Sequence, residues 1–354
     1  MMLRAIWWED SKLHLLDQRR LPMEEVYIHA SSCQQVERAI ADMVVRGAPA
    51  IGIAAAYGFV LAWRDYGTSV EAFHKAVDQL AMARPTAVNL LHAIKFMQRA
   101  LARYQSQDAD HGQCYELLLG EALGYHEADI AVNMSIGERG AEVLLGTEDT
   151  GGEISGNHKL RMVTYCNTGS LATGGYGTAL GIIRSLHKAG RIEKVYACET
   201  RPFLQGARLT AYELSKDGIP YELITDNMVA WLCTTRQIDA MVVGADRIAR
   251  NGDTANKIGT LQLALIAQHF KVPFLVAAPV STIDLDIETG TSIPVELRNQ
   301  NEVLGFRDVR WAPEGAVAWN PSFDVTPGRL IHRIVTEKVV IDPSRESITP
   351  DLLR

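Results

Sequence analysis

The segment that decides the fold is YCNTGSLATGGYGTALG, residues 165–181. It leads from a predicted strand over 161–166, through a loop of glycine and hydroxyl residues, into a predicted helix over 178–187. Such a loop presents backbone N–H groups at a helix N-terminus, and these groups bind phosphate. A tight strand-to-helix connection, in which the glycines serve packing alone, is the other interpretation. Five glycines together with several hydroxyl side chains favour an anion-binding loop.

The same strand-then-helix unit recurs on the carboxyl side of this segment. Alternating strands and helices predict a parallel sheet with both faces covered by helices. We therefore expect an α/β fold whose second domain, 131–354, is a Rossmann-like, doubly wound parallel sheet. Its further strands are expected at 194–198, 221–224, 240–243 and 273–277, and its further helices at 205–217, 229–234 and 260–269.

On the amino side of the segment, helical patterns dominate. Two short alternating stretches, 5–8 and 12–16, predict a β-hairpin. The first domain, 1–130, is otherwise expected to be mainly helical, and 146–158 is expected to form an exposed loop. The expected helices lie at 32–45, 50–64, 70–81, 87–104 and 113–142, with Thr86 and either Ser31 or Ser32 as N-caps.

The composition argues against several classes of protein. The 354 residues are 47% hydrophobic and carry a formal net charge of -7, so nucleic acids and membrane surfaces are poor partners. The five cysteines form no C-x-x-C pair and no zinc-spaced cluster, which indicates reduced thiols. The apolar run 48–63 is shorter than the ~20 residues of a membrane span and predicts a buried helix. Early carboxylates at residues 9 and 10 argue against a signal peptide, so we expect a cytoplasmic protein.

Two residues at predicted strand ends carry candidate chemistry, because ligands of open α/β sheets bind beyond the carboxyl ends of the strands. Cys166 adjoins the glycine-rich loop, where N–H groups and cations favour a thiolate that acts as base or nucleophile. A buried cysteine that behaves as a small hydrophobe is the alternative, and it is our interpretation of Cys198 and Cys233. Asp246 can serve as a general acid. A helix cap or an ion pair with Arg247 is the alternative for this carboxylate.

Cations that could hold an anion occur in three places. Lys257, beside Asn256, lies in a predicted polar loop, 251–260, that runs into a helix. Arg46 and Arg84 each precede a predicted helix, where positive charge opposes the helix dipole, and arginine forks suit phosphate oxygens. A solvated lysine and surface arginines are the alternatives.

A nicotinamide dehydrogenase is a weaker interpretation of the glycine-rich loop. Glu199 ends the next predicted strand, as a ribose-binding acid would. However, Gly181 comes one residue too late after Gly175 and Gly177 to complete G-x-G-x-x-G. The chain also has no G-x-x-x-x-G-K-[ST] motif, which excludes a P-loop.

Taken in order, these motifs resemble the methylthioribose-1-phosphate isomerase family over nearly the whole chain. They are RGAPAIG at 46–52, RPTAVNL at 84–90, CNTG at 166–169, ETRP at 199–202, QGAR at 205–208, GADR at 244–247 and NKIGT at 256–260. The resemblance implies an enzyme of methionine salvage that converts 5-methylthio-D-ribose 1-phosphate to 5-methylthio-D-ribulose 1-phosphate. It also implies a homodimer that needs no metal or organic cofactor.

The resemblance further implies roles for individual residues. Asp246 is the implied proton donor, and Cys166 is the implied residue that stabilises or assists the transition state. The implied substrate-binding residues are Arg46, Gly47, Ala48, Arg84, Gln205, Asn256 and Lys257.

The substrate that the resemblance implies constrains the chemistry. Its phosphate blocks the anomeric oxygen, so the ring oxygen must be protonated as its bond to C1 breaks, and Asp246 could supply that proton. The hydrogen at C2 then leaves as a proton to a base, which gives an enol phosphate, or moves to C1 as a hydride. The Cys166 thiolate would be the base on the first route and would support positive charge at C1 on the second. The sequence leaves both routes open.

Two rival functions share the resemblance. A ribose-1,5-bisphosphate isomerase would need a second anion site, whereas the residues beside 46–52 are apolar and favour a thioether. Regulatory subunits of a translation-initiation exchange factor bind a protein and turn over no sugar. The presence of both Cys166 and Asp246 disfavours that class.

Overall fold

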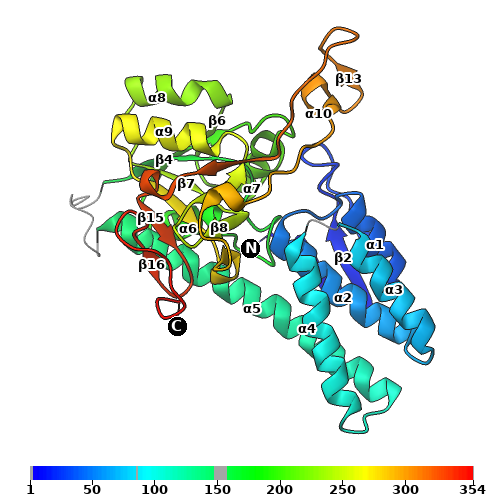
Figure 1. The fold of residues 1–354 in the computed structure, drawn as a ribbon. Helices are drawn as coiled ribbons and strands as arrows, with labels where there is room; N and C mark the ends of the chain where they lie inside the picture. Colours follow the sequence, from blue (N-terminus) through cyan, green and yellow to red (C-terminus); the bar gives the residue numbers. More distant parts are fainter. Residues whose placement is uncertain (1–2, 85–86, 147–157, 354) are drawn as a thin grey trace. The chain divides into compact units, whose positions relative to one another are not determined.

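The structure is a computed structural model that describes residues 3–84, 87–146 and 158–353. It is a mixed α/β chain with a helical N-terminal region and a large, mostly parallel sheet (Figure 1). The chain divides into two compact units: the first comprises 1–131 and 169–177, and the second comprises 132–168 and 178–354. The N-cap predicted at Thr86 and nearly all of the loop predicted at 146–158 lie outside the described residues.

The first unit begins with a small antiparallel sheet of β1 (Ile6–Glu9), β2 (Lys12–Leu16) and β3 (Tyr27–Ala30). The predicted hairpin of β1 and β2 is confirmed, whereas β3 was not predicted. The five predicted helices are also present. They are α1 (Cys33–Ala41), α2 (Ala48–Tyr66), α3 (Val70–Met82), α4 (Val88–Gln105) and α5 (His111–Leu145), and α5 continues from the first unit into the second.

Helix α2 is the centre of the first unit. Every residue from Ala50 to Trp63 is buried, and α2 packs against α1, α3 and α4. Gly58 lets the helices come close, since a Cβ there would lie 3.0 Å from Leu80 of α3 and 3.1 Å from Val36 of α1. The buried helix predicted for the apolar run is therefore confirmed. In the described part of the chain, no helix is both long and apolar enough to cross a bilayer.

The second unit is built on a sheet in which the described residues contribute seven strands, in the order β16-β15-β10-β7-β4-β5-β6. All neighbours are parallel except β16, which runs antiparallel to β15. The predicted strands are confirmed, and β15 and β16 were missed because each is only two or three residues long. The strands are β4 (Leu160–Thr164), β5 (Ile192–Cys198), β6 (Tyr221–Ile224), β7 (Ala240–Val243), β10 (Phe274–Ala277), β15 (Arg333–Val335) and β16 (Val340–Ile341).

Helices cover both faces of this sheet, as predicted (Figure 1). Neighbouring residues of β4 show the alternation, because Met162 packs with one hydrophobic cluster and Val163 with the other. The Met162 face is covered by α6 (Ala179–Lys188), α7 (Ala211–Lys216) and the end of α5. The Val163 face is covered by α8 (Val229–Thr235) and α9 (Thr260–Phe270).

A second, smaller sheet follows β7 and corrects one prediction. Its order is β11 (Ile283–Asp284), β8 (Arg247–Ala249), β9 (Thr254–Lys257) and β14 (Phe323–Thr326). The predicted loop 251–260 was wrong over 254–257, which is strand β9. A turn with Gly252 at φ 81 joins β8 to β9, and Asn251-Gly252 is a strong hairpin signal that the prediction overlooked.

The helix predicted at 205–217 also differs in detail, because it opens with a π-helical turn over Gly206–Thr210 before α7 begins. The remaining elements are short. They are the 3-10 turns Asp226–Met228, Val280–Thr282, Gly290–Ser292 and Gly328–Leu330, helix α10 (Asn301–Leu304), and the strand pair β12 (Gly305–Phe306) and β13 (Val309–Arg310).

Candidate active site

The strand order defines where a site should lie. From β4 the chain adds β5 and β6 on one side and β7, β10 and β15 on the other, so the order reverses between β4 and β7. Open α/β sheets bind ligands beyond the carboxyl ends of the strands at such a reversal. Thr164 of β4 lies opposite Val242 of β7, and its Oγ1 donates to the Val242 carbonyl at 2.9 Å. Cys166 and Asp246, which follow these two strands, are thus brought to one edge of the sheet.

Cys166 has an unusual backbone for a non-glycine residue. Its φ is +63°, in the left-handed region, and its side chain is 7% exposed. A left-handed conformation costs a residue with a Cβ about 1–3 kcal/mol and persists only where the surroundings enforce it. A small buried hydrophobe has no need of such a backbone, so the conformation favours the functional interpretation of Cys166.

A buried polar network lies directly behind Cys166. Asn167 donates from Nδ2 to Glu213 Oε1 at 2.7 Å, and Glu213 is fully buried. Arg184 donates to Glu213 Oε2 at 2.8 Å and to Asp217 Oδ2 at 2.6 Å. Burial lowers the pKa of Arg184, but the two carboxylates outweigh it and the net shift is upward. The ion pair of Arg184 with Glu213 is therefore bonded to Asn167, the residue that follows Cys166.

Asp246 is exposed and begins no helix. Strand β8 follows it, and its backbone N–H donates to the Ala255 carbonyl of β9 at 2.9 Å. The helix-cap alternative is therefore wrong. Arg247 forms an ion pair with Asp284, with Nη1 and Oδ2 3.5 Å apart.

The β8–β9 pairing also brings Asn256 to the end of the ladder near Asp246. Arg247 pairs with Ala255, and Asp246 precedes Arg247 on one strand while Asn256 follows Ala255 on the other. Asn256 is buried, and its Nδ2 donates to Thr260 Oγ1 at 3.0 Å. Asn256 thus lies at the strand-end edge, although it belongs to a strand and not to a loop.

Lys257 is not a solvated surface lysine. It is half-buried, its Nζ donates to the Ser322 carbonyl at 2.9 Å, and the same nitrogen lies 4.9 Å from the centre of the Phe323 ring. The ammonium is therefore held at the end of β9 beside Asn256, where it can meet an anion with little loss of side-chain entropy.

Two buried oxygen atoms at this edge have no hydrogen-bond partner among the described residues, namely Gln205 Oε1 and Thr168 Oγ1. Gln205 follows β5, and the next residue, Gly206, packs so tightly that a Cβ would lie 1.6 Å from the Cys198 carbonyl oxygen. Thr168 packs against Gly244, where a Cβ would lie 2.4 Å from Thr168 Cγ2. Buried polar atoms without partners are rare, and a bound water, an ion or a ligand can supply the missing partner. Our site prediction missed Thr168, although it lies in the opening segment.

The first unit holds the other group of predicted site residues. Arg46 donates from Nε to Gln18 Oε1 at 3.3 Å, and Gln18 donates from Nε2 to the Leu171 carbonyl at 2.6 Å. Gly47 has φ +92°, and a Cβ there would lie 2.5 Å from the Ala172 carbonyl oxygen. Ala48 opens α2 directly afterwards. The turn at 46–48 and the loop 169–177 therefore lie together.

Helix α5 fixes the other side of the same loop. The N–H of Gly174 donates to Asp129 Oδ2 at 2.7 Å, and the Gly174 carbonyl accepts from His126 Nε2 at 2.9 Å. A carbonyl can only accept, so Nε2 of His126 carries a proton. Burial lowers the pKa of the ring, and Nδ1 lies 3.2 Å from the Tyr57 hydroxyl. Arg84, half-buried at the end of α3, belongs to the same unit.

Two acidic residues, Glu199 and Asp226, lie beyond the ends of strands β5 and β6. Asp226 accepts the N–H groups of Thr200 at 2.8 Å and Arg201 at 2.7 Å, yet burial outweighs these bonds and raises its pKa. Burial and the neighbouring Asp226 also raise the pKa of Glu199. Among the described residues, no group of three or more His, Cys, Asp or Glu side chains is placed to hold a metal ion.

The fold and the site define an α/β protein with its polar groups gathered where the strand order of a mostly parallel sheet reverses. The chain belongs to the Initiation factor 2 subunit family, whose model matches residues 44–343.

Two relatives of similar length share one name. A methylthioribose-1-phosphate isomerase from Geobacter sp. (strain M21) is 49% identical over 346 residues, which cover 96% of this chain and 96% of that protein. A protein of the same name from Thermotoga maritima is 49% identical over 345 residues and covers 97% of this chain and 96% of its own length.

Solved structures agree on the fold. The 5-methylthioribose 1-phosphate isomerase from Pyrococcus horikoshii OT3 matches with a TM-score of 0.88 and 36% identity, covering 99% of this chain and 94% of that chain. A structure described as translation initiation factor eIF-2B, subunit delta, from A. fulgidus matches with a TM-score of 0.85 and 39% identity, covering 96% of both chains.

Proposed function

We propose that this protein is an aldose–ketose isomerase that converts 5-methylthio-D-ribose 1-phosphate to 5-methylthio-D-ribulose 1-phosphate in methionine salvage. The observation that carries the proposal is the arrival of Cys166 and Asp246 at neighbouring strand ends, where the strand order reverses. The near full-length relatives named methylthioribose-1-phosphate isomerase support the same activity. General acid–base work of this kind needs a proton donor and a second group within one site.

In this proposal Asp246 protonates the ring oxygen as the bond to C1 breaks. Its exposed carboxyl can meet a substrate directly. Cys166 then takes the proton from C2 and returns it to C1 of the enol phosphate, or it stabilises positive charge at C1 while a hydride moves from C2 to C1. On both routes the C2 hydroxyl loses its proton as the carbonyl forms, and this proton restores the acid form of Asp246. No metal or organic cofactor is required by either route, because the substrate supplies both the hydrogen and the carbonyl carbon.

Substrate binding is proposed for the two groups of polar residues described above. Lys257 would pair with phosphate, and the buried Oε1 of Gln205 would accept a sugar hydroxyl, which would give this oxygen the partner it lacks. Arg46 and Arg84 provide further cations. The complete set of proposed binding residues is Arg46, Gly47, Ala48, Arg84, Gln205, Asn256 and Lys257.

The test is a product assay in which the purified protein is given methylthioribose 1-phosphate or ribose 1,5-bisphosphate. We expect turnover of the first compound only, and we expect Cys166→Ser to lose it. Turnover of only the bisphosphate would replace the substrate. The relative described as an initiation-factor subunit makes a regulatory role the second candidate, and a protein inactive on both sugars would favour that role.

We also propose the finer classification of the fold. The order β6-β5-β4-β7-β10-β15 corresponds to 3-2-1-4-5-6, the order of doubly wound, Rossmann-like sheets. We propose that 1–130 and 131–354 are the two domains. The boundary falls inside α5, and the loop 169–177 groups with the first of them.

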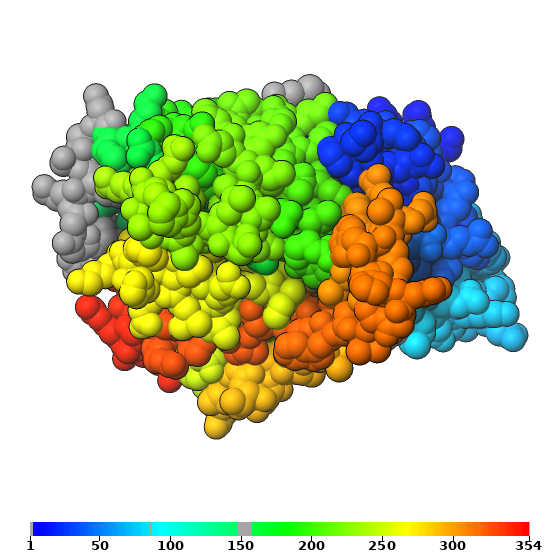
Figure 2. Space-filling view, turned by 90° about the horizontal axis from the view of Figure 1, so that it is seen from above, coloured from blue at the N-terminus to red at the C-terminus, as the bar shows by residue number. Residues whose placement is uncertain are grey.

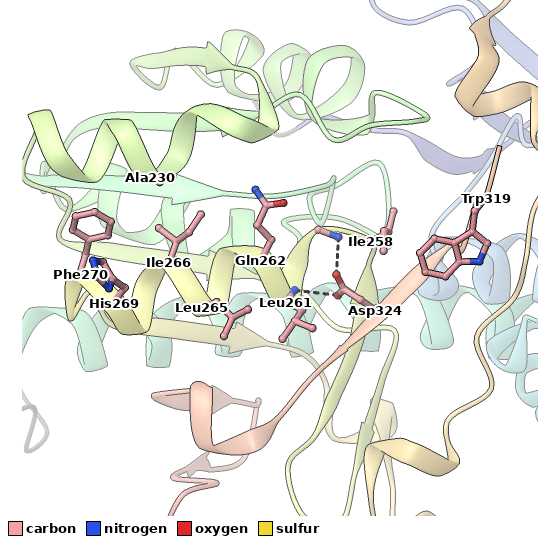
Figure 3. A pocket seen from close by; sticks show the side chains of 11 residues that line it. Ala230, Ile258, Leu261, Gln262, Leu265, Ile266, His269, Phe270, Trp319 and Asp324 are labelled. Atoms are coloured by element: carbon pink, nitrogen blue, oxygen red, sulfur yellow. Dashed lines mark hydrogen bonds between the residues drawn. The ribbon is translucent and has the colours of Figure 1, made fainter. Parts of the chain in front are cut away.

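Finally, we propose a homodimer that acts in the cytoplasm, in which a second copy of the chain binds the face of α8 and α9 (Figure 2). A groove of about 670 Å³ runs along α9 and is lined mainly by apolar side chains (Figure 3). Large exposed apolar patches mark association surfaces. The exposed apolar residues in and around this face are Met228, Trp231, Leu265 and Trp319.

Light scattering after size-exclusion chromatography tests the dimer. We expect Trp231→Asp to shift the protein toward monomer, because a buried unpaired charge opposes association. Met82→Asp, at another exposed apolar residue in the first unit, is the matched control and should leave the mass unchanged. A dimer that tolerates Trp231→Asp would place the interface elsewhere.

A further inference from the structure

The backbone of Cys166 is held by two side-chain hydroxyls. Its N–H donates to Thr200 Oγ1 at 2.9 Å, and its carbonyl accepts from Thr210 Oγ1 at 2.5 Å. Strand β4 ends two residues earlier, at Thr164. Beyond the end of β4, the sheet no longer bonds the N–H and the carbonyl of Cys166. Both groups are instead bound to threonines from other parts of the chain.

Thr200 is itself fixed from two sides. It is fully buried at the end of β5, and its hydroxyl donates to the Cys198 carbonyl at 3.2 Å, which leaves an oxygen lone pair for the N–H of Cys166. Its own backbone is left-handed, with φ +64°, and its N–H donates to Asp226 at 2.8 Å. The acceptor offered to Cys166 thus has one defined orientation.

Thr210 is fixed in a complementary way. It ends the π-helical turn Gly206–Thr210 and is 1% exposed. Its hydroxyl donates to the Cys166 carbonyl and accepts from Asn167 Nδ2 at 3.3 Å. Glu213 holds the same amide nitrogen, and Arg184 holds Glu213. Such π-turns occur often at functional sites.

We infer that Thr200 and Thr210 are positioning residues that keep Cys166 in its left-handed conformation and so aim its thiol. The two hydroxyls bind both polar groups of the Cys166 backbone, so their loss would favour relaxation to an extended backbone, which would point the Cβ elsewhere. The inference rests on the proposed function only where it assigns the thiol a task in the reaction. The conformation itself can be tested separately.

The kinetic test compares Thr210→Val, which removes the hydroxyl at nearly constant volume, with Thr210→Ser, which keeps it. We expect the valine variant to lose about 10²-fold in kcat, the effect of a misplaced reactive group, with KM little changed. The serine variant should stay near the wild type. A valine variant with wild-type kcat, or equal losses in both variants, would overturn the inference.

A second readout does not depend on catalysis. The rate at which iodoacetamide alkylates Cys166 is followed by peptide mass spectrometry, with the partly exposed Cys233 as internal reference. Thiol reactivity depends on exposure and local charge, so the rate at Cys166 should change in Thr210→Val and stay constant in Thr210→Ser. An unchanged rate in the valine variant would contradict the inference.

The experiments distinguish a failure of the proposed role of the thiol from a failure of the positioning role of the threonines. If Cys166→Ala retains full turnover of methylthioribose 1-phosphate, the proposed role of the thiol fails, while the alkylation result still decides whether the threonines set its position. If Cys166→Ala is inactive and Thr210→Val matches the wild type in both readouts, the positioning role fails and the proposed function stands.

Discussion

Asp246 and Cys166 reach the same edge of the sheet with different surroundings. Cys166 is buried and held in a left-handed backbone, whereas Asp246 is exposed at the start of a strand. The difference suits the two proposed tasks, because a proton donor must meet the substrate oxygen directly. A thiol that carries or stabilises charge works better where water is excluded.

Replacing Asp246 by asparagine tests the acid. The amide keeps the size of the side chain but has no proton to donate, so we expect turnover to fall by about 10²–10⁴-fold, while calorimetry still detects substrate binding. Asp284→Asn is the control, because Asp284 is a carboxylate of the same small sheet. Substantial activity in Asp246→Asn would remove this residue from the mechanism.

Lys257 tests the proposed phosphate contact. In Lys257→Met the apolar stem beside Phe323 is kept and the ammonium is lost. A hydrogen bond to a charged group is worth about 1.5–3 kcal/mol, so we expect KM to rise by roughly 10–100-fold with a smaller change in kcat. The control is Lys194→Met, because Lys194 of β5 is paired with Glu222. This variant should leave KM unaltered. A wild-type KM in Lys257→Met would contradict the contact.

At the scale of elements, the sequence predicted those segments whose signals are local. Strands β6 and β7 have the predicted bounds, and the buried character of α2 follows from an apolar run without polar positions. The β8–β9 hairpin was missed, although the Asn251-Gly252 pair is typical of a hairpin turn. Strands β15 and β16 are too short to produce a periodic pattern.

The site was predictable in part for the same reason. Cys166, Asp246 and Lys257 follow or end strands, and strand ends can be read from a sequence. Thr168, Thr200 and Thr210 were not chosen, because a threonine hydroxyl is meaningful only through its partners. Thr210 bonds a carbonyl 44 positions away, and no local pattern reports such a contact.

Gly47, just before helix α2, lies in a close contact with the loop 169–177. Its φ of +92° and a Cβ position 2.5 Å from the Ala172 carbonyl oxygen leave no room for alanine. We expect Gly47→Ala to lower the free energy of unfolding by more than about 2 kcal/mol, as measured in urea. Gly120→Ala is the matched control, since a Cβ there meets nothing within 4 Å in helix α5, and it should stabilise by up to about 1 kcal/mol. Equal effects at both positions would refute the close approach.

At the scale of the whole molecule, one carboxyl makes stability depend on pH. Asp324 accepts the N–H groups of Gly259 at 2.7 Å and Leu261 at 3.1 Å at the start of α9 (Figure 3). Burial nevertheless raises its pKa from 3.8 to about 6. Between these two values the folded protein keeps a proton that the unfolded chain has released.

The sign follows from that proton. Because the folded Asp324 keeps its proton in this window, its contribution to the free energy of unfolding falls as pH rises from about 4 to 6, by up to about 3 kcal/mol. Chemical denaturation of the wild type and of Asp324→Asn at several pH values isolates the effect. The advantage of the wild type over the variant should shrink with rising pH, and a growing advantage would mean that the pKa is lowered.

The loop 169–177 has a consequence for how the protein is made. Gly47 and Ala50 both pack against Ala172, and His126 and Asp129 both bond Gly174. During synthesis these partners leave the ribosome well before the loop does. The first unit therefore cannot complete its native contacts when its own 131 residues have emerged, but must wait until residue 177 follows. A chain stopped at 131 would lack these contacts, so this amino-terminal segment should not be expected to behave as an autonomous folding unit.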